Sequence, residues 1–202
     1  MSLEKPVPTQ TSWRELFDAW FHPQPPLPNP ERMKRWFVAD PAFDATLRCF
    51  EPWLDGDLPR EWHRHPESAL TLVLLYDQIP RNLYRGTAKA FAWDSTGLQV
   101  TKAAIARGDD RRVDPIARGF FYLPFEHHES LASQDEAVRL FQALLQEFPA
   151  SDRKLGEIYL DFAEKHRDVV RRFGRFPHRN RALGRESTPA ELEYLAQPGA
   201  GF

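Results

Sequence analysis

A run of apolar residues from Ala69 to Tyr76 constrains the fold of this chain more than any other feature of its sequence. Within the segment Glu67 to Ile79 these residues cover every face of a helix, and a helix that is apolar all round has to be buried. Pro66 stands just before the segment, a position that proline favours at the start of a helix. A buried strand is the alternative interpretation, but the chain has no second apolar run with which such a strand could pair. The run therefore predicts a central buried helix.

Further helices are predicted on both sides of this run by capping signals and by apolar residues at helical spacing. Capping boxes, in which Ser or Thr stands three residues before Glu, are predicted at Ser133–Glu136 and at Thr188–Glu191, and Gly108 and Gly174 are predicted left-handed helix ends. The predicted helices lie near residues 12–21, 41–50, 67–79, 87–108, 133–148, 155–174 and from 188 onward. With at least six helices and no hairpin signal, the predicted fold class is all-α, as a compact array of antiparallel helix pairs.

The length of 202 residues and the hydrophobic share of 42% fit a single domain, 1–202, with a sizeable core. We expect residues 1–10 to be disordered and the proline-rich stretch 22–30 to be an extended connector. The one cysteine, Cys49, excludes an intramolecular disulfide and suits a reducing cytoplasm, and its apolar helical face suggests a core residue. Because the longest apolar run is far shorter than a bilayer span, we expect a cytoplasmic protein without a membrane partner.

The sharpest imbalance of charge lies between Arg171 and Arg185, in a chain whose net charge is -2. This stretch holds six arginines and His178 but no acidic residue, and the guanidinium group suits carboxylate and phosphate ligands. The segment Pro80 to Gly86 carries a second, smaller set with the same chemistry. The candidate ligand-binding residues are Arg81, Asn82, Arg85, Arg175, Arg179, Asn180 and Arg185.

A structural role for the same arginines is the alternative interpretation. They could hold their loops in place by bonding helix C-terminal carbonyls and buried carboxylates such as Asp77, Glu126 or Glu129. The sequence leaves both interpretations open and does not show whether the loops 80–86 and 174–185 meet in space. It argues against nucleic acid as a partner, because one basic loop offers few phosphate contacts.

A second group of candidates combines histidines with carboxylates. The candidate catalytic residues are Asp77, Glu126, His127, His166 and His178. In a site of low dielectric constant they could act as acid and base, or bind a metal through imidazole and carboxylate. The adjacent pair His127 and His128 would point in different directions on a helix, and no HExxH spacing occurs, so no metal site is assigned. Hydrogen bonding within the core is the alternative role for His127 and His166.

Three stretches of this sequence together resemble a family known mainly from bacteria and classified as a domain of unknown function. They are Ala69–Asn82 with Tyr84–Thr87, Tyr122–His127, and Phe173–Asn180 with Leu183–Arg185. The resemblance spans nearly the whole chain and implies a compact bundle of antiparallel helix pairs, grouped with tetratricopeptide-like proteins. It implies no activity, cofactor or substrate. The family usually has serine where this chain has His128, which argues against His128 as an essential ligand.

Two functions are compatible with these features. The first is the binding of a small anionic ligand, bearing phosphate or carboxylate, in a pocket lined by arginine and histidine; if the protein is an enzyme, acid–base hydrolysis or isomerisation is the expected reaction class. The second is a helical interaction module that binds a peptide in a groove, where the same arginines hold an acidic end. No cofactor motif is present, and the sequence leaves open whether the protein is an enzyme and what its oligomeric state is.

Overall fold

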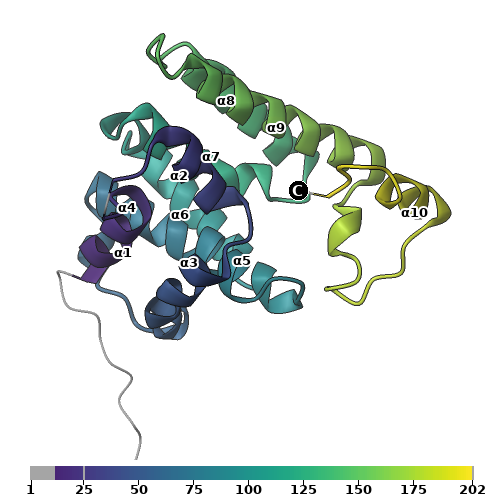
Figure 1. Ribbon diagram of the computed structural model, residues 1–202, viewed down its shortest axis with the longest axis horizontal. Coiled ribbons are helices and arrows are strands. Elements are labelled where there is room, and N and C mark those ends of the chain that lie inside the picture. The colour runs from purple at the N-terminus through teal and green to yellow at the C-terminus, as the bar shows by residue number, and fades with distance from the viewer. Residues whose placement is uncertain (1–11, 25, 202) are drawn as a thin grey trace, which may run out of the picture. The chain divides into compact units, whose positions relative to one another are not determined.

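The computed structural model describes residues 12–24 and 26–201, and this part of the chain is all-helical and contains no strand (Figure 1). The predicted disorder of residues 1–10 lies outside the described residues. The chain divides into two compact units. Unit 1 comprises the described residues up to Arg85 together with Ala90–Val113, and unit 2 comprises Gly86–Lys89 and the described residues from Asp114 onward. The single domain expected from the chain length stays a prediction.

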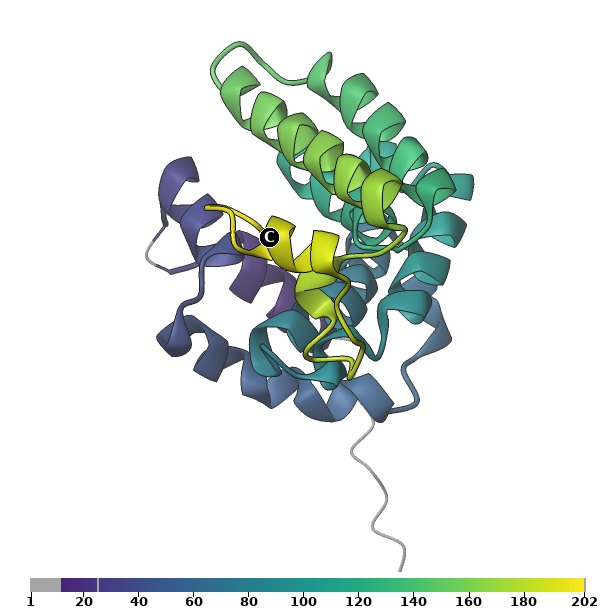
Figure 2. The same cartoon turned by 90° about the vertical axis from the view of Figure 1, so that its right-hand side faces the viewer.

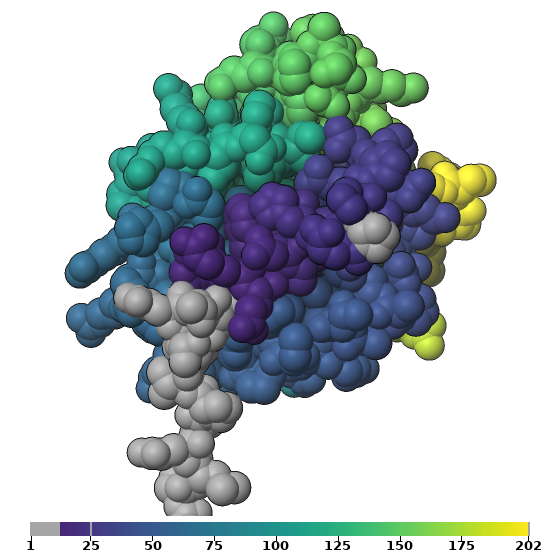
Figure 3. All heavy atoms as spheres, turned by 60° about the vertical axis from the view of Figure 1, so that its left-hand side comes forward, coloured from purple at the N-terminus to yellow at the C-terminus, as the bar shows by residue number. Residues whose placement is uncertain are grey.

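Unit 1 is built around the predicted central helix. Its helices are α1 (Ser12–Phe21), α2 (Asn29–Phe37), α3 (Pro41–Thr46), α4 (Pro66–Val73), α5 (Ile79–Leu83) and α6 (Asp94–Ala106), with 3-10 turns η1 (Leu47–Asp55), η2 (Arg60–His63), η4 (Ala88–Phe91, shared with unit 2) and η5 (Asp110–Arg112). Helix α4 packs against α1 and α6. On the face seen in Figure 3, α1 is flanked by α2, whose Trp36 indole donates a hydrogen bond of 3.0 Å to the carbonyl of Trp20.

The central helix contains a π-helical turn, η3 (Leu74–Gln78), between α4 and α5. In this turn the Ile79 N–H bonds the carbonyl of Leu74, five residues earlier. Pro80 follows directly; in an α-helix its ring would clash with a carbonyl four residues earlier and its missing N–H would break the ladder. The wider turn accommodates this proline without ending the helix. The segment is buried, which confirms the central buried helix.

Unit 2 consists of α7 (Pro115–Glu126), α8 (Leu131–Leu145), α9 (Arg153–Phe173), the 3-10 turn η6 (Pro177–Arg179) and α10 (Pro189–Leu195). Helices α8 and α9 run antiparallel and side by side, and both pack against α7 (Figures 1 and 2). The all-α class is thus confirmed, while the tetratricopeptide-like arrangement stays a prediction. Across the described residues, each helix is too short or too polar to span a membrane.

Local capping signals are partly confirmed. Gly108 and Gly174 adopt φ values of 75° and 70°, and Gly174 caps α9. The capping box of α10 is present, with Thr188 Oγ1 accepting from the Glu191 N–H and Glu191 Oε2 accepting from the Thr188 N–H at 2.7 Å. These signals involve residues only a few positions apart, so the sequence was sufficient to predict them.

Other expectations were wrong. Helix α8 begins at Leu131 rather than at a capping box of Ser133, whose hydroxyl lies 2.9 Å from His128 Nδ1. The helix expected over 87–108 is interrupted, since η4 precedes α6. Cys49 is exposed on η1 rather than buried, because the apolar residues of this 3-10 segment that face the core are its neighbours such as Leu47 and Phe50. Helices α2 and α7 were not predicted, and α2 takes up the end of the proline-rich stretch 22–30.

Two glycines provide a matched test of packing. A Cβ at Gly119 would lie 2.5 Å from Cε2 of Tyr159, a buried ring whose hydroxyl donates to the carbonyl of Ile116. A Cβ at Gly97 would lie 3.6 Å from the nearest atom, an ordinary contact.

We therefore expect Gly119→Ala to lower the free energy of unfolding by about 1–3 kcal/mol through overpacking. Gly97→Ala should leave it unchanged or raise it by up to about 1 kcal/mol, because alanine favours the helix. Urea denaturation of the two variants measures both, and equal effects would contradict the packing described here.

Candidate functional site

The candidate residues of unit 1 lie in a network of ion pairs. Arg81 donates to both carboxylate oxygens of Asp94, at 2.8 and 3.0 Å, and to the carbonyl of Asp77 at 2.6 Å. The carboxylate of Asp77, which is buried, lies 3.2 Å from the same guanidinium. Asn82 and Arg85 both donate to Asp44. These contacts match the structural alternative weighed from the sequence, because the cations are held by carboxylates of their own unit.

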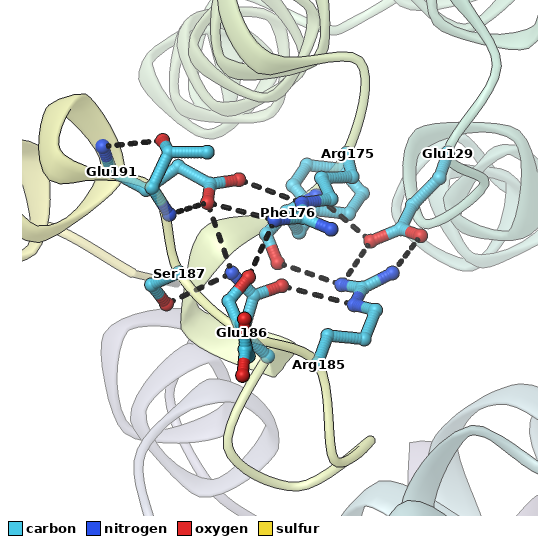
Figure 4. Close-up of polar contacts among 9 residues, drawn as sticks. Glu129, Arg175, Phe176, Arg185, Glu186, Ser187 and Glu191 are labelled. Atoms are coloured by element: carbon cyan, nitrogen blue, oxygen red, sulfur yellow. Dashed lines mark hydrogen bonds and ion pairs between the residues drawn. The ribbon is translucent and has the colours of Figure 1, made fainter.

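In unit 2, two arginines of the predicted loop are also paired (Figure 4). Arg175 donates to both carboxylate oxygens of Glu191, at 2.7 and 2.8 Å, and to the carbonyl of Glu186. The hydrogen bond from Arg175 lowers the pKa of Glu191 to about 2. Asn180 adds a bond from its amide to Ser187. The ion pair and the amide bond hold the loop 174–188 against the start of α10.

The second pair, Arg185 with Glu129, holds the backbone of Phe176 as well. Arg185 donates to both oxygens of Glu129, at 2.7 and 2.9 Å, and to the carbonyl of Phe176 at 3.1 Å. Glu129 in turn accepts from the Phe176 N–H at 2.8 Å. Burial raises the pKa of Glu129, but the hydrogen bonds from Arg185 and Phe176 outweigh it and lower the pKa overall. One carboxylate and one guanidinium thus fix both polar groups of a single peptide segment (Figure 4).

Phe176 is fully buried, and three candidate side chains surround its ring. Ring centroids of His166 and His178 lie 5.5 and 5.6 Å from that of Phe176, and the guanidinium carbon of Arg179 lies 4.5 Å from it. Arg179 is only 6% exposed, whereas His178 is half-buried. All three groups therefore pack against the ring of Phe176.

Glu126 and His127 join the same group from the C-terminal end of α7. The carboxylate of Glu126 lies 3.2 Å from His166 Nδ1, and the rings of His127 and His166 are 6.1 Å apart. Glu126 and His166 are buried, and His127 is half-buried. We call Glu126, His127, His166, His178 and Arg179 the histidine–arginine site. Four of the five predicted catalytic residues lie in it, while Asp77 belongs to unit 1.

The tautomer of His166 follows from its hydrogen bond. Nδ1 lies 2.8 Å from the carbonyl of Phe162, which can only accept, so Nδ1 carries the proton and Nε2 the lone pair. Burial lowers the pKa of His166 well below 6.5, and the positive charges of His127, Arg179 and His178 lower it further. His166 is therefore neutral at pH 7, the form in which imidazole acts as a base or a metal ligand.

Gln134 supports this site and was not predicted from the sequence. Its side-chain amide is buried and donates to the carbonyls of Glu126 and His128, at 2.6 and 2.8 Å. Like Phe176, Gln134 looks like an ordinary residue of its segment in the sequence. The histidine pattern offered no signal for either residue, because their roles depend on contacts with the end of α7 and with α9.

An open cavity of about 570 Å³ lies elsewhere in unit 2, between the end of α9 and the start of α10. It is lined by Arg172, Phe173, Arg175, Thr188, Ala190 and Glu191. Of the predicted ligand-binding residues, only Arg175 reaches it, and Arg175 is engaged by Glu191. An anion in this cavity would have to compete with that carboxylate.

Residues 16–199 match the family described as "Bacterial protein of unknown function (DUF924)". The chain belongs to this family. A solved structure of a protein of unknown function from Agrobacterium tumefaciens is 39% identical to it, with a TM-score of 0.69; the alignment covers 91% of this chain and 96% of that protein. None of the curated proteins matches the chain. The DUF924 assignment confirms the resemblance seen in the sequence and brings no activity with it.

The role of the Arg185–Glu129 pair can be tested against a neighbour in the same loop. Arg185→Ala removes four hydrogen bonds, and because the pair is about a quarter exposed we expect a loss of about 2 kcal/mol in the free energy of unfolding. Arg181→Ala, at an exposed position, should change it by less than about 0.5 kcal/mol. Chemical denaturation measures the free energy of unfolding of both variants. Equal losses would show that the Arg185–Glu129 pair does not stabilise the loop.

The buried neutral His166 predicts a pH dependence of stability. Its pKa in the folded state lies below the unfolded value of 6.5, so its contribution is complete above pH 6.5 and is lost as pH falls toward the lowered pKa. The slope from this one proton is at most about 1.4 kcal/mol per pH unit. Urea denaturation from pH 7.5 to 5 should show a weaker loss of stability in His166→Gln than in the wild type. An unchanged slope in the variant would contradict the assignment.

Proposed function

We propose that this protein binds a small anionic ligand, bearing phosphate or carboxylate, at the histidine–arginine site. The observation that carries the proposal is the packing of a buried guanidinium and two imidazoles around the ring of Phe176, with a third imidazole and a carboxylate beside His166 at the end of α7. Burying such groups is costly, so clusters of them with shifted pKa values are typical of functional sites.

The charge of the site supports an anion as its ligand. Arg179 carries a permanent positive charge beside Phe176, and the pKa of His166 is lowered first by burial and then by the charges that His127, Arg179 and His178 carry when protonated. A phosphate or carboxylate would reverse that effect and could accept hydrogen bonds from guanidinium and imidazole. Half-buried His127 and His178 stand at the border between the site and solvent.

The other predicted arginines contribute in a different way. Arg175 and Arg185 hold the loop through Glu191 and Glu129, so in this proposal they position the site rather than bind the ligand. Arg179 is the arginine of this loop that lies in the site itself. Hydrolysis is the reaction class we propose, because imidazole and carboxylate groups activate water either directly or through a metal ion.

Thermal denaturation with inorganic phosphate, pyrophosphate and citrate tests the binding proposal, with sodium chloride at matched ionic strength as reference. Binding should raise Tm, by about 2–4 °C for each kcal/mol in a chain of this size. Arg179→Gln and His178→Ala should abolish the rise, whereas Arg181→Ala should keep it. The absence of stabilisation by all three anions at millimolar concentration would refute the proposal, as would an unchanged rise in both site variants.

Peptide binding is the second candidate, and exposed apolar side chains on α9 favour it. Ile158 and Phe162 lie one turn apart and are 36% and 44% exposed. An acidic peptide with apolar residues would be held through this face. Fluorescence anisotropy with such a peptide separates the candidates: a loss of binding in Phe162→Ser with an unchanged response to phosphate supports the peptide.

A further inference from the structure

Three potential metal-binding atoms converge where α7 ends against α9. One carboxylate oxygen of Glu126 and one ring nitrogen each of His127 and His166 lie within 4.8 Å of one another. Glu126 is the last residue of α7 and His127 its C-cap, whereas His166 comes from the middle of α9. Glu126 and His127 thus meet the same residue of the neighbouring helix, whereas His128 lies against Ser133.

The donor set suits a particular class of ion. Two imidazoles and one carboxylate are a combination that Zn²⁺ accepts, and three protein ligands leave one position of its tetrahedron open. With bonds of about 2.0–2.1 Å, ligand atoms of a tetrahedral ion stand roughly 3.3 Å apart. The observed limit of 4.8 Å means that a bound ion would draw the three atoms closer together. Half-buried His127 is the ligand with room to move.

The surroundings of His166 are those of a metal ligand. A metal-binding imidazole nearly always donates its second ring N–H to a carbonyl or carboxylate, which orients the ring and fixes the tautomer. His166 Nδ1 makes this contact with the carbonyl of Phe162 at 2.8 Å and also lies 3.2 Å from Glu126 Oε1, which leaves the lone pair on Nε2. An ion bound there would therefore draw the Glu126 carboxylate toward Nε2. The side-chain amide of Gln134 donates a hydrogen bond to the backbone carbonyl of Glu126.

We propose that Glu126, His127 and His166 bind one divalent transition-metal ion, for which Zn²⁺ is the best match, with a coordination position left open for water or for the anionic ligand. The proposal deepens the proposed function, and only its hydrolytic part rests on that function. The single carboxylate leaves the loaded site with a net positive charge, next to Arg179. An anion should therefore bind more tightly when the metal is present, and the metal more tightly when the anion is present.

Titration of the EDTA-treated full chain with Zn²⁺ alone, followed by isothermal calorimetry, tests the metal site directly. We expect one ion per chain, and an affinity at least 10-fold lower in His127→Ala and in His166→Asn. His128→Ala is the matched control, because His128 follows directly in the sequence but lies against Ser133. It should bind Zn²⁺ like the wild type. Absorption of the Co²⁺ form provides a second measurement, with the intense visible bands of a four-coordinate ion expected in the wild type and lost in His127→Ala.

The outcomes separate this inference from the proposed function. No stoichiometric Zn²⁺ binding, or equal affinity in His127→Ala and His128→Ala, overturns the metal site. His127 is half-buried, so its variant should remain folded, which circular dichroism checks. Phosphate binding by the metal-free chain with no Zn²⁺ binding supports the anion site alone, whereas Zn²⁺ binding without any response to the anions supports the metal site and overturns the anionic ligand.

Discussion

The ion pair between Glu129 and Arg185 is the interaction on which the candidate site depends. The carboxylate of Glu129 accepts two hydrogen bonds from Arg185 and one from the N–H of Phe176. Arg185 also donates a hydrogen bond to the carbonyl of Phe176. Charge-assisted, bidentate bonds of this kind are among the stronger ones in proteins. Since the ring of Phe176 lies among His166, His178 and Arg179, the ion pair holds the ring against which these three groups pack.

The arginines show how far a sequence can be interpreted. Their number and the absence of acidic neighbours single out the loop 174–185, because local charge is visible in the sequence. Their partners are not visible: Glu129 is 56 residues from Arg185, and Asp44 is 41 residues from Arg85. The positive charge of these loops is neutralised by carboxylates that are distant in the sequence. Of the predicted arginines, only Arg179 lies in the histidine–arginine site.

The helix signals likewise divide into those that depend on neighbours in the sequence and those that depend on other contacts. The box at Thr188 and the left-handed Gly174 depend on neighbours in the chain, and both were predicted correctly. Ser133 carries the same local pattern but is buried against His128, so the helix starts earlier. Helix α7 was missed because all its residues from Ala117 to Glu126 are buried and it contains Pro124, which leaves no amphipathic period to detect. For α7, burial against the rest of the unit removed the periodic pattern, whereas at Ser133 a contact with a residue five positions earlier replaced the cap.

The side chain of Gln134 has a consequence for the rigidity of the site. The last carbonyls of a helix usually face water and the final turn frays, which makes it a poor platform for groups that must be held still. At the end of α7 the Gln134 amide of α8 donates to the carbonyls of Glu126 and His128 in place of water. Glu126 and His127 therefore stand on a helix turn whose end is hydrogen-bonded to the neighbouring helix. Such a terminus is preorganised: little entropy remains to be lost when something binds there.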